Sequence, residues 1–427
     1  MMLDRSRPWL ARNYFALALA CFWLAFLVLP TAKSVNNVFY ALVALPGLFV
    51  VSRRWRELPW RETGFLLFVA WLSYGALSAM AWGPAGYDRI KDVVYVFLFY
   101  SVVIVTVDPS WWQGELLRRL AFWLALSYVL GSCVYLWLSG AYAFGEQVLW
   151  LPARMTGPIY TSMFLVSLWA LAIEDWLVRK RYAELSLATV LMLFCMLQGL
   201  QSRTGLVGFA AVVLFLLLRR RSVAGLAILA GLAALVVAYL GLAGGAETVQ
   251  SWSLVARADS YRFELWGKVF GEMRECGWIL GCGYGHAIHS SLDVSTALRI
   301  AHSHSIFVAQ ALLGGAVGLS LLVAMLLWSL VGGWRRNAPW ALCLAAGAIM
   351  LNFDGNRLID NPDELWLLFH WPLAVLIALH AHRASARDES ATPMPPRKAS
   401  RPGVHEPLLR GASAAQAAVT AATSSGG

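Results

Sequence analysis

Charged side chains are scarce in this sequence, because only 14% of its 427 residues are Asp, Glu, Lys or Arg. Soluble domains typically carry about 25% charged and 45–50% apolar residues, whereas 59% of this chain is hydrophobic. The composition therefore excludes a water-soluble globular protein. Alternation of apolar and polar residues is also lacking, as in TGLVGFAAVVLFLLL at 204 to 218, which excludes a transmembrane β-barrel.

Long apolar runs are what the sequence has in abundance. A helix needs about 20 apolar residues to cross a bilayer, and runs near this length recur along the chain, bounded by charges or turn residues. We therefore predict an all-α polytopic integral membrane protein with about twelve transmembrane helices. The predicted spans are 13–29, 35–51, 64–81, 92–107, 120–139, 159–178, 183–199, 204–218, 223–243, 305–331, 339–353 and 364–380.

The charge balance of +10 comes from 34 basic and 24 acidic residues. On a soluble protein such an excess would suggest nucleic-acid binding. Here most of the basic residues fall in segments on one side of the predicted membrane when the N-terminus is placed inside, as the positive-inside rule requires. We expect a multi-pass membrane protein with both termini cytoplasmic and no nucleic-acid partner. The first apolar run lacks a cleavage site for a signal peptide.

Two segments are too long to be simple connections. Residues 383–427 are polar and proline-containing, so we expect a disordered cytoplasmic tail after a membrane-embedded domain at 1–382. Residues 244–304 form a large loop on the predicted outer side of the membrane. From Tyr261 to Met273 its apolar residues follow helical spacing. This amphipathic helix can lie in the membrane interface or pack on the protein's own helices.

The same loop contains Cys276 and Cys282 and a glycine-rich segment, GWILGCGYG, at 277 to 285. Glycine permits tight turns and close approach of the backbone to a ligand. The two cysteines could form a disulfide in an oxidising compartment, but two free thiols or a turn residue would give the same pattern.

Several arginines lie on the predicted outer side of the membrane, where the positive-inside rule disfavours basic residues. The arginines beside the spans are partly desolvated, which is costly for a charged group. A polyanionic ligand that pairs with them would offset this cost and so explains the set. Snorkelling or a salt bridge remains the alternative for any single member. The predicted anion site draws on Arg154, Arg203, Arg257, Arg262, Arg299 and Arg357, with His302 and His304 nearby.

His304 stands where the loop re-enters the membrane. A neutral imidazole there can take a proton from a hydroxyl without a metal. The alternative is a histidine that caps the helix end by bonding to backbone. Gly315 and Gly318 follow on the same helix, where small residues permit close packing.

These residues resemble a known family. His304-Ser305, nine residues, Gly315, two residues and Gly318 are similar to the His-[Asn/Ser/Gln]-x9-Gly-x2-[Gly/Thr/Tyr] signature of bacterial O-antigen ligases, within the larger ligase/polymerase family. The segment from Arg262 to Trp266 resembles the family's Arg-x-x-Leu-Trp-like motif. Arg203-Thr-Gly-Leu-Val resembles its arginine at the outer end of a mid-chain span.

The resemblance implies a metal-independent, inverting glycosyltransferase without a cofactor. Such an enzyme would move polysaccharide from undecaprenyl diphosphate to the sugar core of lipid A, at the periplasmic face of the bacterial inner membrane. Membrane lipids would surround it. The implied catalytic residues are His304 as general base and Arg203 and Arg262 as stabilisers of the diphosphate. Substrate binding is assigned to Arg154, Arg257, Arg299, Arg357, His302, Ser305 and Tyr284. A rival metal site would use the carboxylates Asp354, Asp360, Asp363 and Glu364.

Two other functions stay open at this point. A polysaccharide polymerase or a protein O-oligosaccharyltransferase of the same family would share the signature histidine. A transporter or flippase would also have twelve spans, but it would need ionisable groups at mid-membrane depth. Glu174 and Asp175 lie instead near the cytoplasmic end of a span.

Overall fold

The computed structural model describes residues 3–81, 84–155, 157–219, 262–287, 292–295, 298–300 and 303–391, together with a few isolated positions between 227 and 234. The chain divides into Met1–Ser385 and Ala386–Gly427. Nearly all of the predicted tail, and most of the predicted span at 223–243, lie outside the described residues. The last helix continues past residue 382, to Ala391.

The helical prediction is confirmed for the described residues, where helices coincide with the other eleven predicted spans. The helices are α1 (Leu3–Val28), α2 (Ala32–Phe39), α3 (Leu45–Arg54), α4 (Thr63–Met80), α5 (Pro84–Tyr87), α6 (Ile90–Thr106), α7 (Pro109–Gln113), α8 (Glu115–Leu138), α9 (Pro158–Val178), α10 (Tyr182–Phe194), α11 (Arg203–Arg219), α15 (Arg262–Cys276), α16 (Ile306–Arg336), α17 (Ala338–Asp354) and α18 (Trp371–Ala391). Three wider, π-helical turns, η1 (Tyr40–Ala44), η3 (Cys195–Leu200) and η4 (Trp366–His370), continue neighbouring helices, and a 3₁₀ turn, η2 (Trp55–Glu57), follows α3.

Fewer of these helices are membrane-crossing by length and composition than the twelve predicted. Among the described residues, six are long and apolar enough, namely Ala32–Glu57, Thr63–Met80, Glu115–Leu138, Pro158–Val178, Tyr182–Leu200 and Ile306–Arg336. Asn13–Val28 and Ala338–Asp354 are shorter apolar helices. The structure thus supports a multi-pass membrane protein, and the count of twelve stays a prediction.

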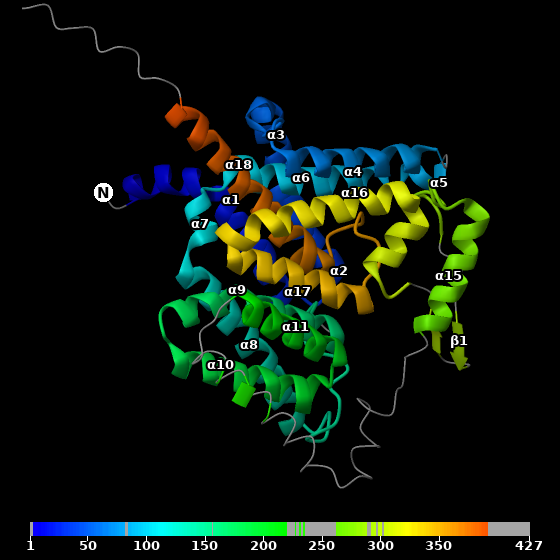
Figure 1. The fold of residues 1–427 in the computed structure, drawn as a ribbon. Coiled ribbons are helices and arrows are strands. Elements are labelled where there is room, and N and C mark those ends of the chain that lie inside the picture. The colour runs from blue at the N-terminus through cyan, green and yellow to red at the C-terminus, as the bar shows by residue number, and fades with distance from the viewer. Residues whose placement is uncertain are drawn as a thin grey trace, which may run out of the picture. The chain divides into compact units, whose positions relative to one another are not determined.

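The packing centres on α9 and α17, which lie against each other (Figure 1). Nearly every side chain of α9 between Thr161 and Leu177 is buried, and α16 packs on both α4 and α17. Large aromatic rings such as Trp169 and Trp366 are fully buried in this core. Helix α15 lies across the end of this bundle in Figure 1 and contacts α16.

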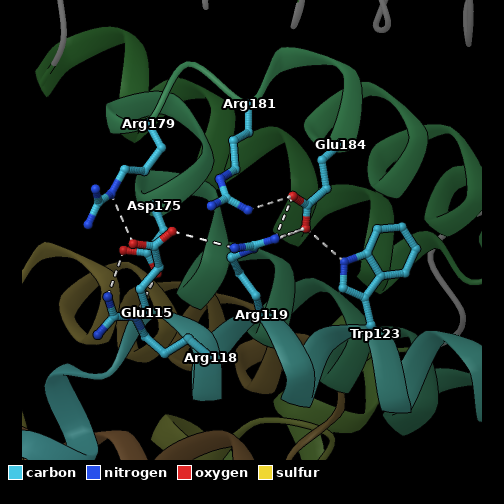
Figure 2. Close-up of polar contacts among 8 residues, drawn as sticks. All are labelled: Glu115, Arg118, Arg119, Trp123, Asp175, Arg179, Arg181 and Glu184. Atoms are coloured by element: carbon cyan, nitrogen blue, oxygen red, sulfur yellow. Dashed lines mark hydrogen bonds and ion pairs between the residues drawn. The ribbon is translucent and has the colours of Figure 1, made fainter. Parts of the chain in front are cut away.

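At one end of the bundle, which we call the arginine-rich end, neighbouring helices are joined by ion pairs (Figure 2). Arg118 of α8 binds Asp175 of α9 at 2.6 Å. Arg119 binds Glu184 of α10 at 2.7 Å, and the indole of Trp123 donates to the same carboxylate. These side chains are partly buried, so their charges are matched where water is limited. The arginines that set the predicted topology therefore also fasten α8, α9 and α10 together.

Helix α16 is broken at Gly315, whose φ of 58° and ψ of −161° are not helical. The glycine-rich loop fills the break. Cys282 N–H donates to Leu312 O at 2.7 Å and Gly283 N–H to Leu313 O at 2.9 Å. The loop thereby replaces backbone bonds that the helix loses, as a membrane-embedded break requires.

The loop approaches α16 so closely that glycine is required on both sides. A Cβ on Gly315 would stand 2.5 Å from Gly281 N, and one on Gly281 would stand 2.6 Å from Leu312 O. Gly281 also has a φ of 72°, a conformation that glycine adopts without penalty. The second glycine of the family-like signature, Gly318, faces Tyr74 and Gln310.

Two features of the loop go beyond the sequence prediction. Cys276 and Cys282 form a disulfide, which resolves the alternative that the sequence left open. Strands β1 (Leu292–Ser295) and β2 (Leu298–Ile300) pair antiparallel, so the expectation of a purely helical chain missed a short hairpin. Alternation over three or four residues is too short a signal to separate a strand from a loop.

We expect Gly281→Ala to lower the free energy of unfolding by about 2 kcal/mol or more, because the new methyl group displaces backbone that cannot yield. The matched control is Gly140→Ala, which has nearly the same φ, 74°, but nothing within 4 Å of its Cβ. Thermal unfolding of both variants in detergent measures the difference. Equal losses would mean that the left-handed backbone, and not the close approach to α16, explains Gly281.

Candidate functional site

His304 lies in a tight turn immediately before α16. Its φ is 52°, and in the described residues only Lys180 and Gln201 share a positive φ among non-glycine residues. Ser305 is the N-cap of α16, and its hydroxyl accepts from Val308 N–H at 3.2 Å. A left-handed backbone costs a non-glycine residue about 1–2 kcal/mol, so the surrounding contacts must hold His304 in place.

Asp354, the last residue of α17, orients the imidazole. The His304 Nδ1 and an Asp354 carboxylate oxygen are 2.5 Å apart, and the side chains are 20% and 6% exposed. Two residues earlier in α17, Asn352 Oδ1 accepts a hydrogen bond from the Ser305 hydroxyl at 2.9 Å. The end of α17 therefore fixes both residues of the His-Ser pair.

Helix α15 holds the turn from its other side. The indole N–H of Trp266 donates to the backbone oxygen of Ser303 at 2.8 Å. Leu265, Val269 and Met273 face inward, and Val269 and Met273 pack with Val308, Ala311 and Leu312 of α16. The amphipathic helix thus packs on the protein, one of the two alternatives from the sequence, although Phe263 and Phe270 remain exposed.

Arg262 lies on α15 one turn from Trp266, on the same face. Its Nε is buried and has no hydrogen-bond partner among the described residues. The contact from Trp266 to Ser303 therefore places the predicted Arg262 motif beside the predicted base.

Arg203 is the first residue of α11, which packs on α17. A Cβ on Gly208 of α11 would stand 2.6 Å from Met350 Cγ of α17, so these two residues face each other. From that contact, Arg203 lies five residues along α11 and Asp354 four residues along α17 in the same direction. At 1.5 Å per residue both are about 6–8 Å further on, which sets Arg203 level with Asp354.

Arg154 is engaged by protein. Both of its terminal nitrogens bind the Glu364 carboxylate, at 2.6 and 3.0 Å. Asp363 accepts from Leu365 N–H, and burial together with Glu364 raises the Asp363 pKa well above its ordinary value. The carboxylates considered as metal ligands therefore have other roles here, with Asp354 on His304, Glu364 on Arg154 and Asp363 at a helix start.

Arg357 is partly buried and donates to His286 O at 3.4 Å. Burial and the neighbouring Arg89 lower its pKa. Tyr284 is buried, and its hydroxyl donates to Gln310 of α16 at 2.6 Å, so it fastens the glycine-rich loop. Arg257 and His302 lie outside the described residues, and so does the side chain of Arg299.

Sequence reasoning did not find the role of Asp354. It lies 50 residues after His304 in the chain, and no spacing rule connects the two. The sequence did show a carboxylate, Asp354, at the end of a predicted span that lies on the same side of the membrane as the predicted base. From the sequence alone, that carboxylate is only a candidate ligand of the rival metal site.

Comparison with known proteins shows two similarities. A model of the family described as O-antigen ligase matches residues 187–323, which include Arg203, Arg262 and His304. The chain is also 27% identical over 393 residues to the O-antigen ligase of Pseudomonas aeruginosa, covering 86% of this chain and 89% of that protein.

The resemblance to the O-antigen ligases is confirmed. These similarities indicate a glycosyltransferase-type enzyme. The segment that the family model matches runs from α10 through the glycine break of α16. It therefore covers the three predicted catalytic residues but not Asp354.

The Arg154–Glu364 pair separates a structural role from anion binding. We expect Arg154→Ala to destabilise the protein by about 2 kcal/mol, below the 3–5 kcal/mol typical of a fully buried pair because Arg154 keeps some water contact. The double variant Arg154→Ala with Glu364→Gln should regain part of this loss. Unfolding midpoints in detergent test it. A single variant of unchanged stability that binds the donor poorly would instead assign Arg154 to the substrate.

Proposed function

We propose that this enzyme transfers polysaccharide from undecaprenyl diphosphate to a hydroxyl of the lipid A core, at the periplasmic face of the bacterial inner membrane. The single observation that carries the proposal is the His304–Asp354 couple, placed by α17 and by Trp266 of the Arg262 motif at the entry of α16. Both termini would then be cytoplasmic, with the arginine-rich end on that side.

In this mechanism His304 is the general base. Asp354 accepts the Nδ1 proton and so directs the other nitrogen, Nε2, toward the acceptor. Nε2 takes the proton of the acceptor hydroxyl while its oxygen forms a bond to the anomeric carbon of the donor sugar. The strained turn at His304 fits this role, since strained residues cluster where a side chain must be held in one position.

The bond that breaks joins the anomeric carbon to a diphosphate oxygen, which takes the bonding electron pair. Arg203 and Arg262 stabilise the charge that develops on the diphosphate. Arg203 is the first residue of α11, where the helix dipole adds positive potential. In this scheme fixed guanidinium groups do the work that a cation does in other transferases, and the proposal needs no metal.

Ser305 and Arg357 remain secondary proposals. Ser305 acts through Asn352 and the helix cap, which makes it a positioning residue. Arg357 lies beside Arg89, His286 and Asp360, so it would contact a sugar or phosphate away from the reacting bond.

The decisive experiment is transfer in vitro. Purified enzyme, undecaprenyl-diphosphate-linked polysaccharide and lipid A-core are incubated in detergent with EDTA, and product is followed by gel shift. We expect product from the wild type despite EDTA, and a loss of at least about 100-fold in His304→Ala, the lower end of general-base contributions. Arg203→Lys keeps the charge and removes the guanidinium fork, so it should retain more activity than Arg203→Ala.

Other results would lead to different conclusions. Lengthened donor chains without lipid A-core product would make the enzyme a polymerase of the same family. Full activity in folded His304→Ala would refute the base assignment. Substrate accumulation in proteoliposomes without sugar transfer would favour the transporter.

Asp354→Asn provides a finer test of the couple. The amide keeps the shape but can donate to Nδ1, which shifts the ring proton to Nε2 and disables the base. We expect turnover to fall by about 10²–10⁴-fold, with little change in the KM for donor. Asn352→Ala is the control, because it removes the Ser305 contact and leaves the carboxylate. Equal loss in both variants would assign Asp354 to general support of the α16 entry.

A further inference from the structure

Three consecutive apolar side chains on the glycine-rich loop, Trp278, Ile279 and Leu280, project outward. They are 52%, 68% and 62% exposed. We call these three residues the apolar tip. The disulfide between Cys276 and Cys282 closes the turn that carries them, and Phe270 of α15 stacks on Trp278. A patch of this kind marks an interaction site.

The backbone oxygens of the tip are satisfied by the protein. Ala316 N–H donates to Trp278 O at 2.9 Å, and Val317 N–H donates to Ile279 O at 3.2 Å. The Tyr74 hydroxyl donates to Leu280 O at 3.0 Å. All three carbonyl oxygens are therefore bonded to the protein. Non-helical backbone at membrane depth is tolerated only where other protein groups satisfy it, and these three oxygens meet that requirement.

The tip is also continuous with a membrane-facing surface. Its partners Tyr74 and Val317 belong to α4 and α16, two helices long and apolar enough to cross a membrane. Leu77, one turn beyond Tyr74, is 67% exposed and apolar. Tyr74 lies six residues before the end of α4, so its backbone is about 9 Å inside that helix end, and its hydroxyl contacts Leu280 O.

We propose that the apolar tip is inserted into the acyl chains of bilayer phospholipids, in the leaflet on the His304 side. The tip anchors α15 to the membrane, with Trp278 near the interface where tryptophan is favoured. The occupant is lipid and not a second copy of the chain, because the carbonyl oxygens of the tip are bonded to the protein and its neighbours α4 and α16 are long and apolar enough to cross a membrane.

Photocrosslinking of the full chain tests this. The photoreactive residue p-benzoylphenylalanine is placed at Ile279, and the protein is reconstituted in phosphatidylethanolamine and phosphatidylglycerol vesicles with deuterated acyl chains. The matched control carries it at Glu275, an exposed position on the last turn of α15. We expect deuterated phospholipid adducts at 279 in several-fold excess over 275, by mass spectrometry after irradiation. Equal adduct yields at the two positions, or dimers of the chain at 279, would overturn the proposal.

A second arm separates this inference from the proposed function on which its consequence rests. Ile279→Asp should reduce transfer several-fold in vesicles while leaving it near wild type in detergent, because only the bilayer opposes a charge at the tip. Equal activity in vesicles would count against insertion. Phospholipid adducts from a chain that transfers no sugar would leave the insertion intact and refute the ligase.

Discussion

The break in α16 at Gly315 is the constraint from which the site follows. A helix interrupted inside a membrane must recover its lost backbone bonds from other protein groups, and here the loop at 278–283 supplies them. The docked loop contains Cys282, and the disulfide from Cys282 to Cys276 holds the end of α15 beside it. The indole of Trp266 then reaches Ser303 beside His304. The signature glycine, Gly315, is therefore eleven residues from His304 in sequence but supports it through a different segment.

Positive charge serves different purposes at the two ends of the bundle. At the arginine-rich end, Arg118 and Arg119 are matched by carboxylates of neighbouring helices, so their charge joins helices. At the His304 end Arg154 does the same with Glu364. Arg203 instead starts a helix that packs on α17, and Arg262 lies one turn from Trp266, whose indole reaches Ser303 beside His304. Placement beside the His304 turn, and not the count of arginines, distinguishes the candidates for the diphosphate.

The sequence predicted the parts of the molecule that depend on local pattern. Apolar runs located the helices, and helical spacing located α15, because burial of one face imposes a period. The two faces of α15 could not be assigned from that period. Nor could the partner of His304 be predicted, since the contact to Asp354 joins residues 50 positions apart. The packing of GWILGCG into the break of α16 could not be predicted either. A glycine in a sequence indicates conformational freedom, but it does not indicate which segment packs against it.

The same few residues connect the proposed chemistry to the membrane. Both proposed substrates are lipid-anchored, so their reacting groups lie at a depth that the bilayer sets. An enzyme acting on them gains by fixing its base at that depth, because a misplacement of about 1 Å already slows a reaction severely. The loop that carries the apolar tip also fills the break in α16, and α16 begins two residues after His304. Lipid insertion of the tip would therefore hold the base level with both substrates, which joins the family's signature glycine to the depth at which transfer occurs.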